Sequence, residues 1–217
     1  LRVELTAHGV DLPIYWGNRN WHPLLPDTLR QMERDGVTRA VAVFTSAFSS
    51  YSGCRQYQEN IAAAQAEVGH GAPRVDKVRP FFHHPGFLHA VTERTREAVA
   101  ALPEDQRAGA HFLFTAHSIP NAMAATCAYE KQLAEASRLV AEAVGAGSFE
   151  LVYQSRSGPP QVPWLGPDIV DHLPDVAARG VSAVVVVPIG FLSDHVEVLW
   201  DLDEEAREKA LSLGLTF

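Results

Sequence analysis

The chain has 217 residues, of which 47% are hydrophobic and 20% charged, and a formal net charge of −8 at pH 7. This composition is ordinary for a globular protein, and the length suits one large domain or two small ones. The negative charge argues against nucleic acid as the main partner, because binding to a phosphate backbone needs a basic surface.

The two cysteines, Cys54 and Cys127, indicate the compartment. A secreted scaffold stapled by disulfides usually has more of them, so we expect a reducing, cytoplasmic compartment. No apolar run reaches the roughly 18 residues that span a bilayer, and no signal peptide is recognisable. The chain begins at Leu1 without a methionine, in sequence that resembles a domain interior. We therefore expect a fragment of a longer protein.

Helical patterns alternate with short apolar runs along the chain. Three of the helical patterns are closed by Gly36, Gly145 and Gly180, and glycine is the typical residue at a helix C-terminus. The run AVVVVPI at 183–189 is the clearest strand. In chain order, the sequence predicts a helix over 27–35, a strand over 40–45, a helix over 55–68, a strand over 75–79, a helix over 87–102, a strand over 111–116, a helix over 129–144, a strand over 151–154, a helix over 168–179, a strand over 183–189 and a helix over 195–211.

This alternation predicts an α/β fold with parallel sheets. The strands are continuously apolar, which fits sheets that helices cover on both faces. Ligands of such folds bind beyond the carboxyl ends of the strands. The chemistry is therefore expected in the segments that follow strands, namely 46–55, 117–120, 155–168 and 190–197.

Two of these segments carry side chains that bind metals or move protons near neutral pH. His117 directly follows one predicted strand, and Asp194, His195 and Glu197 follow another. If both strands belong to one sheet, these residues meet in one cleft. Two structural interpretations stay open at this point: His117 only caps its strand, or Glu197 only completes a helix capping box with Asp194.

The remaining polar segments admit a functional and a structural interpretation. Segment 155–168 is rich in proline and predicts either the rigid lip of a pocket or an ordinary surface connection. Segment 46–57 mixes hydroxyls, aromatic rings and an arginine, and could receive the carboxylates of an acidic ligand or form a polar turn. His83 and His84 are expected at the surface, and the acidic run 201–205 on a solvated helix face.

Five motifs stand out in order along the chain: YWGNRNWHPLL (15–25), FSSYSGCRQY (48–57), FTAHSIP (114–120), YQSRSGPPQVPWLGPD (153–168) and VPIGFLSDHVEVLWDLDEE (187–205). The last three resemble the signature segments of ferrochelatases, and the first two resemble the actinobacterial branch of that family. The resemblance extends from about residue 15 to the end of the chain. Five motifs in the same order exclude a chance similarity.

The resemblance implies two Rossmann-like lobes with parallel sheets and a porphyrin in the cleft between them. Residues 1–83 would form a partial N-terminal lobe, and residues 84–217 a C-terminal lobe that is incomplete at its end. Ferrochelatases are longer than this chain, with a further strand before Leu1 and a further segment after Phe217.

The resemblance also implies roles for individual residues. His117 would be the metal-site histidine that accepts pyrrole protons, and Glu197 its partner as metal ligand or proton conduit. Asp194 and His195 would support this catalytic pair. Tyr57 would lie against the porphyrin.

The implied reaction is the insertion of ferrous iron into a porphyrin in haem biosynthesis. In the actinobacterial branch the substrate is coproporphyrin III and the product coprohaem. Fe²⁺ is then the substrate metal, and transient contacts with other haem-pathway enzymes are expected. Two alternatives stay open: a related chelatase that inserts cobalt or iron into a different tetrapyrrole, and a porphyrin- or metal-binding module without turnover. The SDHVE and WLGPD segments argue against the related chelatase.

Cys54 matches a cysteine that binds a [2Fe–2S] cluster in some ferrochelatases. A four-cysteine cluster needs three further ligands, and Cys127 matches none of the family positions. This chain alone is therefore not expected to complete a cluster, whereas the full-length protein could. The structural alternative for Cys54 is a plain buried thiol.

Overall fold

The computed structural model describes all residues 1–217, and they form two compact units. Unit 1 contains residues 1–44 and 52–79, and unit 2 contains residues 45–51 and 80–217. The segment 45–51 therefore packs with unit 2, although its neighbours on both sides in the sequence belong to unit 1. The lobe boundary at residues 83 and 84 stays a prediction, and the last crossing between the units lies nearby, at Arg79 and Pro80.

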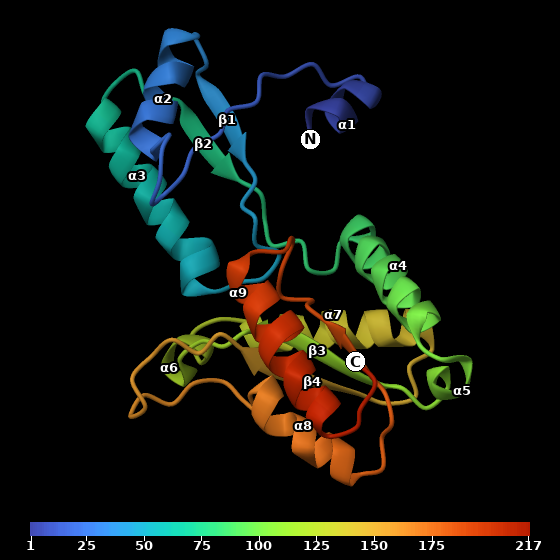
Figure 1. Ribbon diagram of the computed structural model, residues 1–217. Coiled ribbons are helices and arrows are strands. Elements are labelled where there is room, and N and C mark those ends of the chain that lie inside the picture. The colour runs from blue at the N-terminus through green and yellow to red at the C-terminus, as the bar shows by residue number, and fades with distance from the viewer. The chain divides into compact units, whose positions relative to one another are not determined.

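Unit 1 is built on two parallel strands, β1 (Arg39–Ala42) and β2 (Arg74–Lys77). α3 (Gln56–Val68) connects them, because parallel strands need a long crossover connection. α3 lies beside α2 (Leu25–Arg34), as Figure 1 shows. The chain also forms α1 (Arg2–Ala7) before these elements and η1 (Tyr51–Arg55), a π-helical turn that runs directly into α3.

Unit 2 contains a three-stranded parallel sheet in the order β4-β3-β5. The strands are β3 (His111–His117), β4 (Phe149–Gln154) and β5 (Val184–Val187). Residues 111–116 of the central β3 are all buried, because strands cover both of its edges and helices both of its faces. His117 pairs with Gln154, so the carboxyl ends of β3 and β4 meet at one edge of the sheet.

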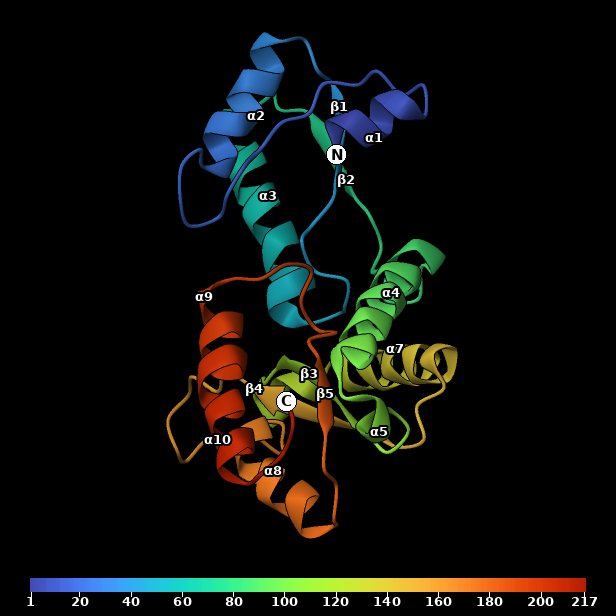
Figure 2. The ribbon, with the colours of Figure 1, turned by 45° about the vertical axis from the view of Figure 1, so that its right-hand side comes forward.

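Successive β3 side chains point to opposite faces of the sheet and enter two separate cores. Phe112 and Phe114 pack with the helices of one face, and Leu113 packs with the helices of the other. Figures 1 and 2 show these helices on the two sides of the sheet. One face carries α4 (Pro85–Ala101) and α7 (Tyr129–Val144), and the other carries α8 (Ile169–Ala178), η2 (Leu199–Ala206) and α10 (Arg207–Ser212).

The predicted α/β fold with parallel sheets is confirmed, and every predicted strand and helix except the last helix is present with boundaries shifted by a few residues. The sequence did not predict three short helices, α1, α5 (Glu104–Arg107) and α6 (Asn121–Ala124). The single helix predicted over 195–211 is wrong in detail. Here α9 (Val196–Val198), η2 and α10 follow one another, and η2 is π-helical. No helix in the structure has both the length and the apolar character needed to cross a membrane.

Candidate active site

His117 and Glu197 come together at the carboxyl edge of the unit 2 sheet. His117 is the last residue of β3, and Glu197 lies in α9, which follows β5. Their Nε2 and Oε1 atoms are 3.9 Å apart, and the side chains are 34% and 52% exposed. The two segments that the sequence predicted to converge therefore do so within one unit, and the pair is open to solvent.

A glycine allows the segment after β5 to approach this edge. Gly190 donates its N–H to the Thr115 carbonyl oxygen at 3.0 Å, which fixes the turn against the end of β3. A Cβ atom at Gly190 would lie 2.6 Å from the Cβ of Ala116, much closer than side-chain carbons can approach. Only glycine fits there without displacing β3, and this close contact brings α9 toward His117.

The hydrogen bond of Nδ1 determines which ring nitrogen of neutral His117 carries the proton. Nδ1 lies 2.5 Å from the Ser118 carbonyl oxygen. A carbonyl oxygen only accepts, so Nδ1 carries the proton and the lone pair of the neutral ring is on Nε2. Nε2 and the Glu197 carboxylate are then two facing acceptors, too far apart for a direct hydrogen bond. Such a pair binds a proton or a divalent cation.

Backbone contacts fix the position of His117. The buried Tyr129 hydroxyl donates to the His117 carbonyl oxygen at 3.1 Å. Burial raises the pKa of Tyr129, so its hydroxyl stays protonated and remains a donor. The next residue is tied on both sides: Ser118 N–H donates to the Gln154 carbonyl oxygen at 2.8 Å, and its hydroxyl to the Leu165 carbonyl oxygen at 2.7 Å. The histidine is thus held on a rigid strand end.

Asp194 and His195 lie next to this pair in the chain but do not contact it through hydrogen bonds. His195 is the N-cap residue of α9 and makes no side-chain cap bond, and its ring packs edge-on against Phe191 at 5.3 Å. Asp194 is exposed. The capping-box interpretation of Glu197 is therefore wrong, because Asp194 is not the N-cap and the Glu197 carboxylate faces His117.

Tyr57 and Cys54 belong to unit 1. The Tyr57 ring packs against Phe44 with centroids 4.7 Å apart, and the Arg19 guanidinium lies 5.2 Å from its centre. The Cys54 sulfur accepts a hydrogen bond from the Lys77 ammonium at 3.3 Å. Cys127 is a free thiol in unit 2.

The chain does not provide a four-thiolate site for an iron–sulfur cluster. It has only two cysteines, and they lie in different units. No group of three or more histidine, cysteine, aspartate or glutamate side chains in the structure has the geometry of a metal site.

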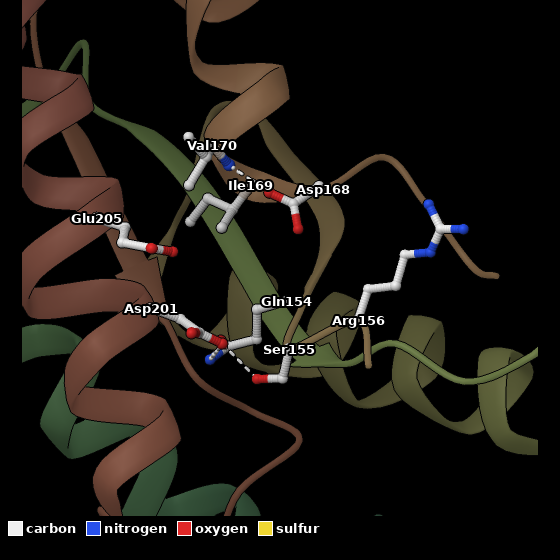
Figure 3. Close-up of a pocket in the computed structure, with 8 residues that line it drawn as sticks. All are labelled: Gln154, Ser155, Arg156, Asp168, Ile169, Val170, Asp201 and Glu205. Atoms are coloured by element: carbon white, nitrogen blue, oxygen red, sulfur yellow. Dashed lines mark hydrogen bonds between the residues drawn. The ribbon is translucent and has the colours of Figure 1, made fainter. Parts of the chain in front are cut away.

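An acidic pocket that the sequence did not predict lies between β4 and η2 (Figure 3). Asp201 accepts hydrogen bonds from the Ser155 hydroxyl and from the Gln154 amide, the latter at 3.3 Å. Burial raises the pKa of Asp168, which also lines the pocket. The lining residues are Gln154, Ser155, Arg156, Asp168, Ile169, Val170, Asp201 and Glu205.

The pocket corrects the interpretation of the acidic run 201–205 and bears on that of segment 155–168. The run 201–205 is not uniformly solvated, because Asp201 turns into the pocket while Asp203 and Glu204 are exposed. The spacing of Asp201 and Glu205, which lie four residues apart and both line the pocket, was the available signal for a shared helix face. Segment 155–168 forms part of the pocket wall, and Arg156 donates to three carbonyl oxygens within it, which fits the rigid-lip interpretation.

His83 and His84 are exposed, as predicted, and His84 has a structural task. Its Nδ1 accepts the Gly86 N–H at 3.1 Å and thereby caps the first turn of α4. This contact satisfies one of the free N–H groups at the helix N-terminus.

Comparisons with known proteins identify the family of the chain. The ferrochelatase family model matches residues 1–217. A coproporphyrin III ferrochelatase of Nocardia farcinica is 54% identical over 99% of this chain and 63% of its own length, and a ferrochelatase of Rhodopirellula baltica is 55% identical over 99% and 61%. A coproporphyrin III ferrochelatase of Mycolicibacterium vanbaalenii is 50% identical over 99% and 64%.

A solved structure shows the same fold at low sequence identity. SirB from Bacillus subtilis with Fe3+ superposes with a TM-score of 0.67 at 12% identity, over 96% of this chain and 75% of that one. The chain spans less than two thirds of the length of the curated relatives named above. Because the family model matches along the whole sequence, the chain belongs to the ferrochelatase family.

Proposed function

We propose that the protein inserts ferrous iron into coproporphyrin III to give coprohaem in haem biosynthesis. The observation that carries this proposal is the Nε2 lone pair of His117 facing the Glu197 carboxylate at 3.9 Å on an open sheet edge. The names of the relatives support it, since several are coproporphyrin III ferrochelatases.

The reaction replaces two pyrrole protons with one Fe²⁺ ion. Nε2 of His117 accepts a proton from a pyrrole nitrogen, and the ring becomes an imidazolium. The Glu197 carboxylate stabilises that positive charge and, being half exposed, passes the proton to water. The neutral ring then accepts the second proton, so that two protons leave as the metal enters.

A metallation assay tests this function. The protein is mixed with Fe²⁺ or Zn²⁺ and coproporphyrin III without oxygen, and the absorbance bands of the metalloporphyrin are followed. We expect catalytic turnover. Spectral binding of the porphyrin without metallation would instead indicate a binding module, and turnover confined to another tetrapyrrole would indicate a related chelatase.

Glu197→Gln is expected to lower the metallation rate by about tenfold to hundredfold, since a neutral amide does not stabilise the imidazolium. Porphyrin binding, measured by fluorescence titration, should change little. Glu208→Gln is the matched control, because Glu208 is exposed on α10 and lies outside the site. An unchanged rate in Glu197→Gln would remove the carboxylate from the mechanism.

The finer expectations stay proposals. A cytoplasmic location and transient contacts with other haem-pathway enzymes rest on the family resemblance. The two Rossmann-like lobes with a porphyrin between them, and Tyr57 against that porphyrin, have the same basis. Cys54 as a cluster ligand remains a prediction for a longer chain, because Cys54 and Cys127 together do not form the site.

A further inference from the structure

The first turn of α7 holds two segments of unit 2 that are distant in the sequence. Tyr129 donates to the carbonyl oxygen of His117. One turn later, Gln132 Oε1 accepts the Ser49 N–H at 2.7 Å, and Gln132 Nε2 donates to the Ser49 hydroxyl oxygen at 2.8 Å. Residues three apart lie on the same side of a helix, so His117 and Ser49 attach to one face of α7.

Packing fixes the segment around Ser49. Phe48 is 2% exposed, and its ring meets the Tyr129 ring edge-on with centroids 6.3 Å apart. The buried Ala47 carbonyl oxygen accepts the N–H groups of Phe81 and Phe82. Segment 45–51 therefore keeps one position relative to α7 without the Gln132 amide, and the two Gln132 bonds act mainly on Ser49.

The direction of these bonds determines what the Ser49 hydroxyl can do. A serine hydroxyl has one proton to donate and two lone pairs that accept. The Gln132 N–H occupies a lone pair, and Gln132 Oε1 is engaged with the backbone N–H. The hydroxyl proton is therefore directed away from Gln132. It has no acceptor in the structure, and Ser49 is only partly buried.

We propose that the Ser49 hydroxyl donates a hydrogen bond to a carboxylate of the porphyrin substrate, and that Gln132 is the positioning residue that orients it. This inference rests on the proposed function. A hydrogen bond to a charged group contributes more than one between neutral groups, and partial exposure reduces it. Loss of this bond is expected to lower the affinity for the porphyrin about tenfold.

Steady-state kinetics test the role of each residue. Ser49→Ala and Gln132→Leu are each expected to raise KM for coproporphyrin III about tenfold, a larger change than in kcat, and to leave KM for Fe²⁺ unchanged. The double variant should lose little more than either single variant, because both act through one donor. Lys131→Gln, an exposed change on the same turn, is the control.

The Gln132→Glu variant distinguishes orientation of the Ser49 hydroxyl from simple structural support of the segment around Ser49. A carboxylate at 132 accepts both the Ser49 N–H and the Ser49 O–H, so the segment keeps two bonds but the hydroxyl proton is used. We expect an exchange-protected Ser49 amide together with a raised porphyrin KM. A wild-type KM in Gln132→Glu or in Ser49→Ala would overturn the proposal.

Equilibrium binding keeps this test independent of turnover. If the wild-type protein binds coproporphyrin III but does not metallate it, the proposed function fails. Ser49→Ala must then still weaken the porphyrin Kd about tenfold for the carboxylate contact to stand. An unchanged Kd, or a wild-type protein that does not bind the porphyrin, overturns the contact as well.

Discussion

Replacing His117 with alanine is expected to reduce metallation of coproporphyrin III by about a thousandfold, within the range known for loss of a general base. The variant removes the nitrogen whose lone pair faces Glu197, and no other histidine contacts that carboxylate. The porphyrin should still bind, because binding depends on shape and on the carboxylates of the ligand. Initial rates by absorbance and Kd values by fluorescence quenching measure the two effects separately.

Two further histidine variants sharpen this prediction. His89→Ala changes an exposed residue of α4 and should leave the rate within about twofold of wild type, as surface substitutions away from a site do. His195→Ala should have a much smaller effect than His117→Ala, because His195 packs on Phe191 and does not face Glu197. Equal rates for His117→Ala and wild type would eliminate His117 as the proton acceptor.

Sequence patterns predicted the parts of the site that follow from local order. The continuously apolar run 111–116 identified a buried central strand, and the rule that ligands bind beyond carboxyl ends then pointed to His117. The same reasoning selected the segment after β5. The convergence of the two segments depends on β5 pairing with β3, which the apolar runs alone do not specify.

Other features depend on contacts between residues far apart in the sequence, and local patterns do not contain them. The capping-box spacing of Asp194 and Glu197 suggested a structural role, but the preceding turn places His195 at the N-cap. The pairing of Ser155 with Asp201 depends on α8 packing against both β4 and η2. The bonds of Gln132 to Ser49 join residues 83 positions apart, so no periodicity indicated them.

A second long-range cluster stabilises the end of the sheet opposite His117. Glu150 of β4 accepts one hydrogen bond from Nη1 and one from Nη2 of Arg179, both at 2.9 Å. Its Oε2 also lies 2.6 Å from His172 Nε2 and 3.1 Å from His111 Nε2, and the His111 side chain is only 5% exposed. One carboxylate therefore joins β3, β4 and α8.

Glu150→Gln is expected to lower the free energy of unfolding of unit 2 by about 1–3 kcal/mol at pH 7. Breaking a buried ion pair costs about 3–5 kcal/mol, and the one-third exposure of Glu150 reduces that figure. A neutral amide also leaves the buried His111 ring and the Arg179 guanidinium without their charged partner. Urea unfolding, followed by hydrogen exchange of the β3 and β4 amides, measures the change.

The loss of stability in Glu150→Gln is expected to depend on pH. Arg179, followed by His172 and His111, holds the pKa of Glu150 well below its usual range. A carboxylate with a lowered folded-state pKa stabilises the fold above its unfolded pKa of about 4.3, and this contribution is lost as the pH falls toward the folded value. The gap between wild type and Glu150→Gln should therefore be full at pH 7 and shrink progressively below about pH 4.

Glu135→Gln is the matched control for this cluster. Glu135 pairs with Arg138 on the exposed side of α7, where both side chains are nearly half exposed. Removing its charge should change the stability by less than about 1 kcal/mol, because water screens a surface pair. If Glu150→Gln is no more destabilising than Glu135→Gln, or if its effect grows on acidification, then the carboxylate of Glu150 does not hold β3, β4 and α8 together.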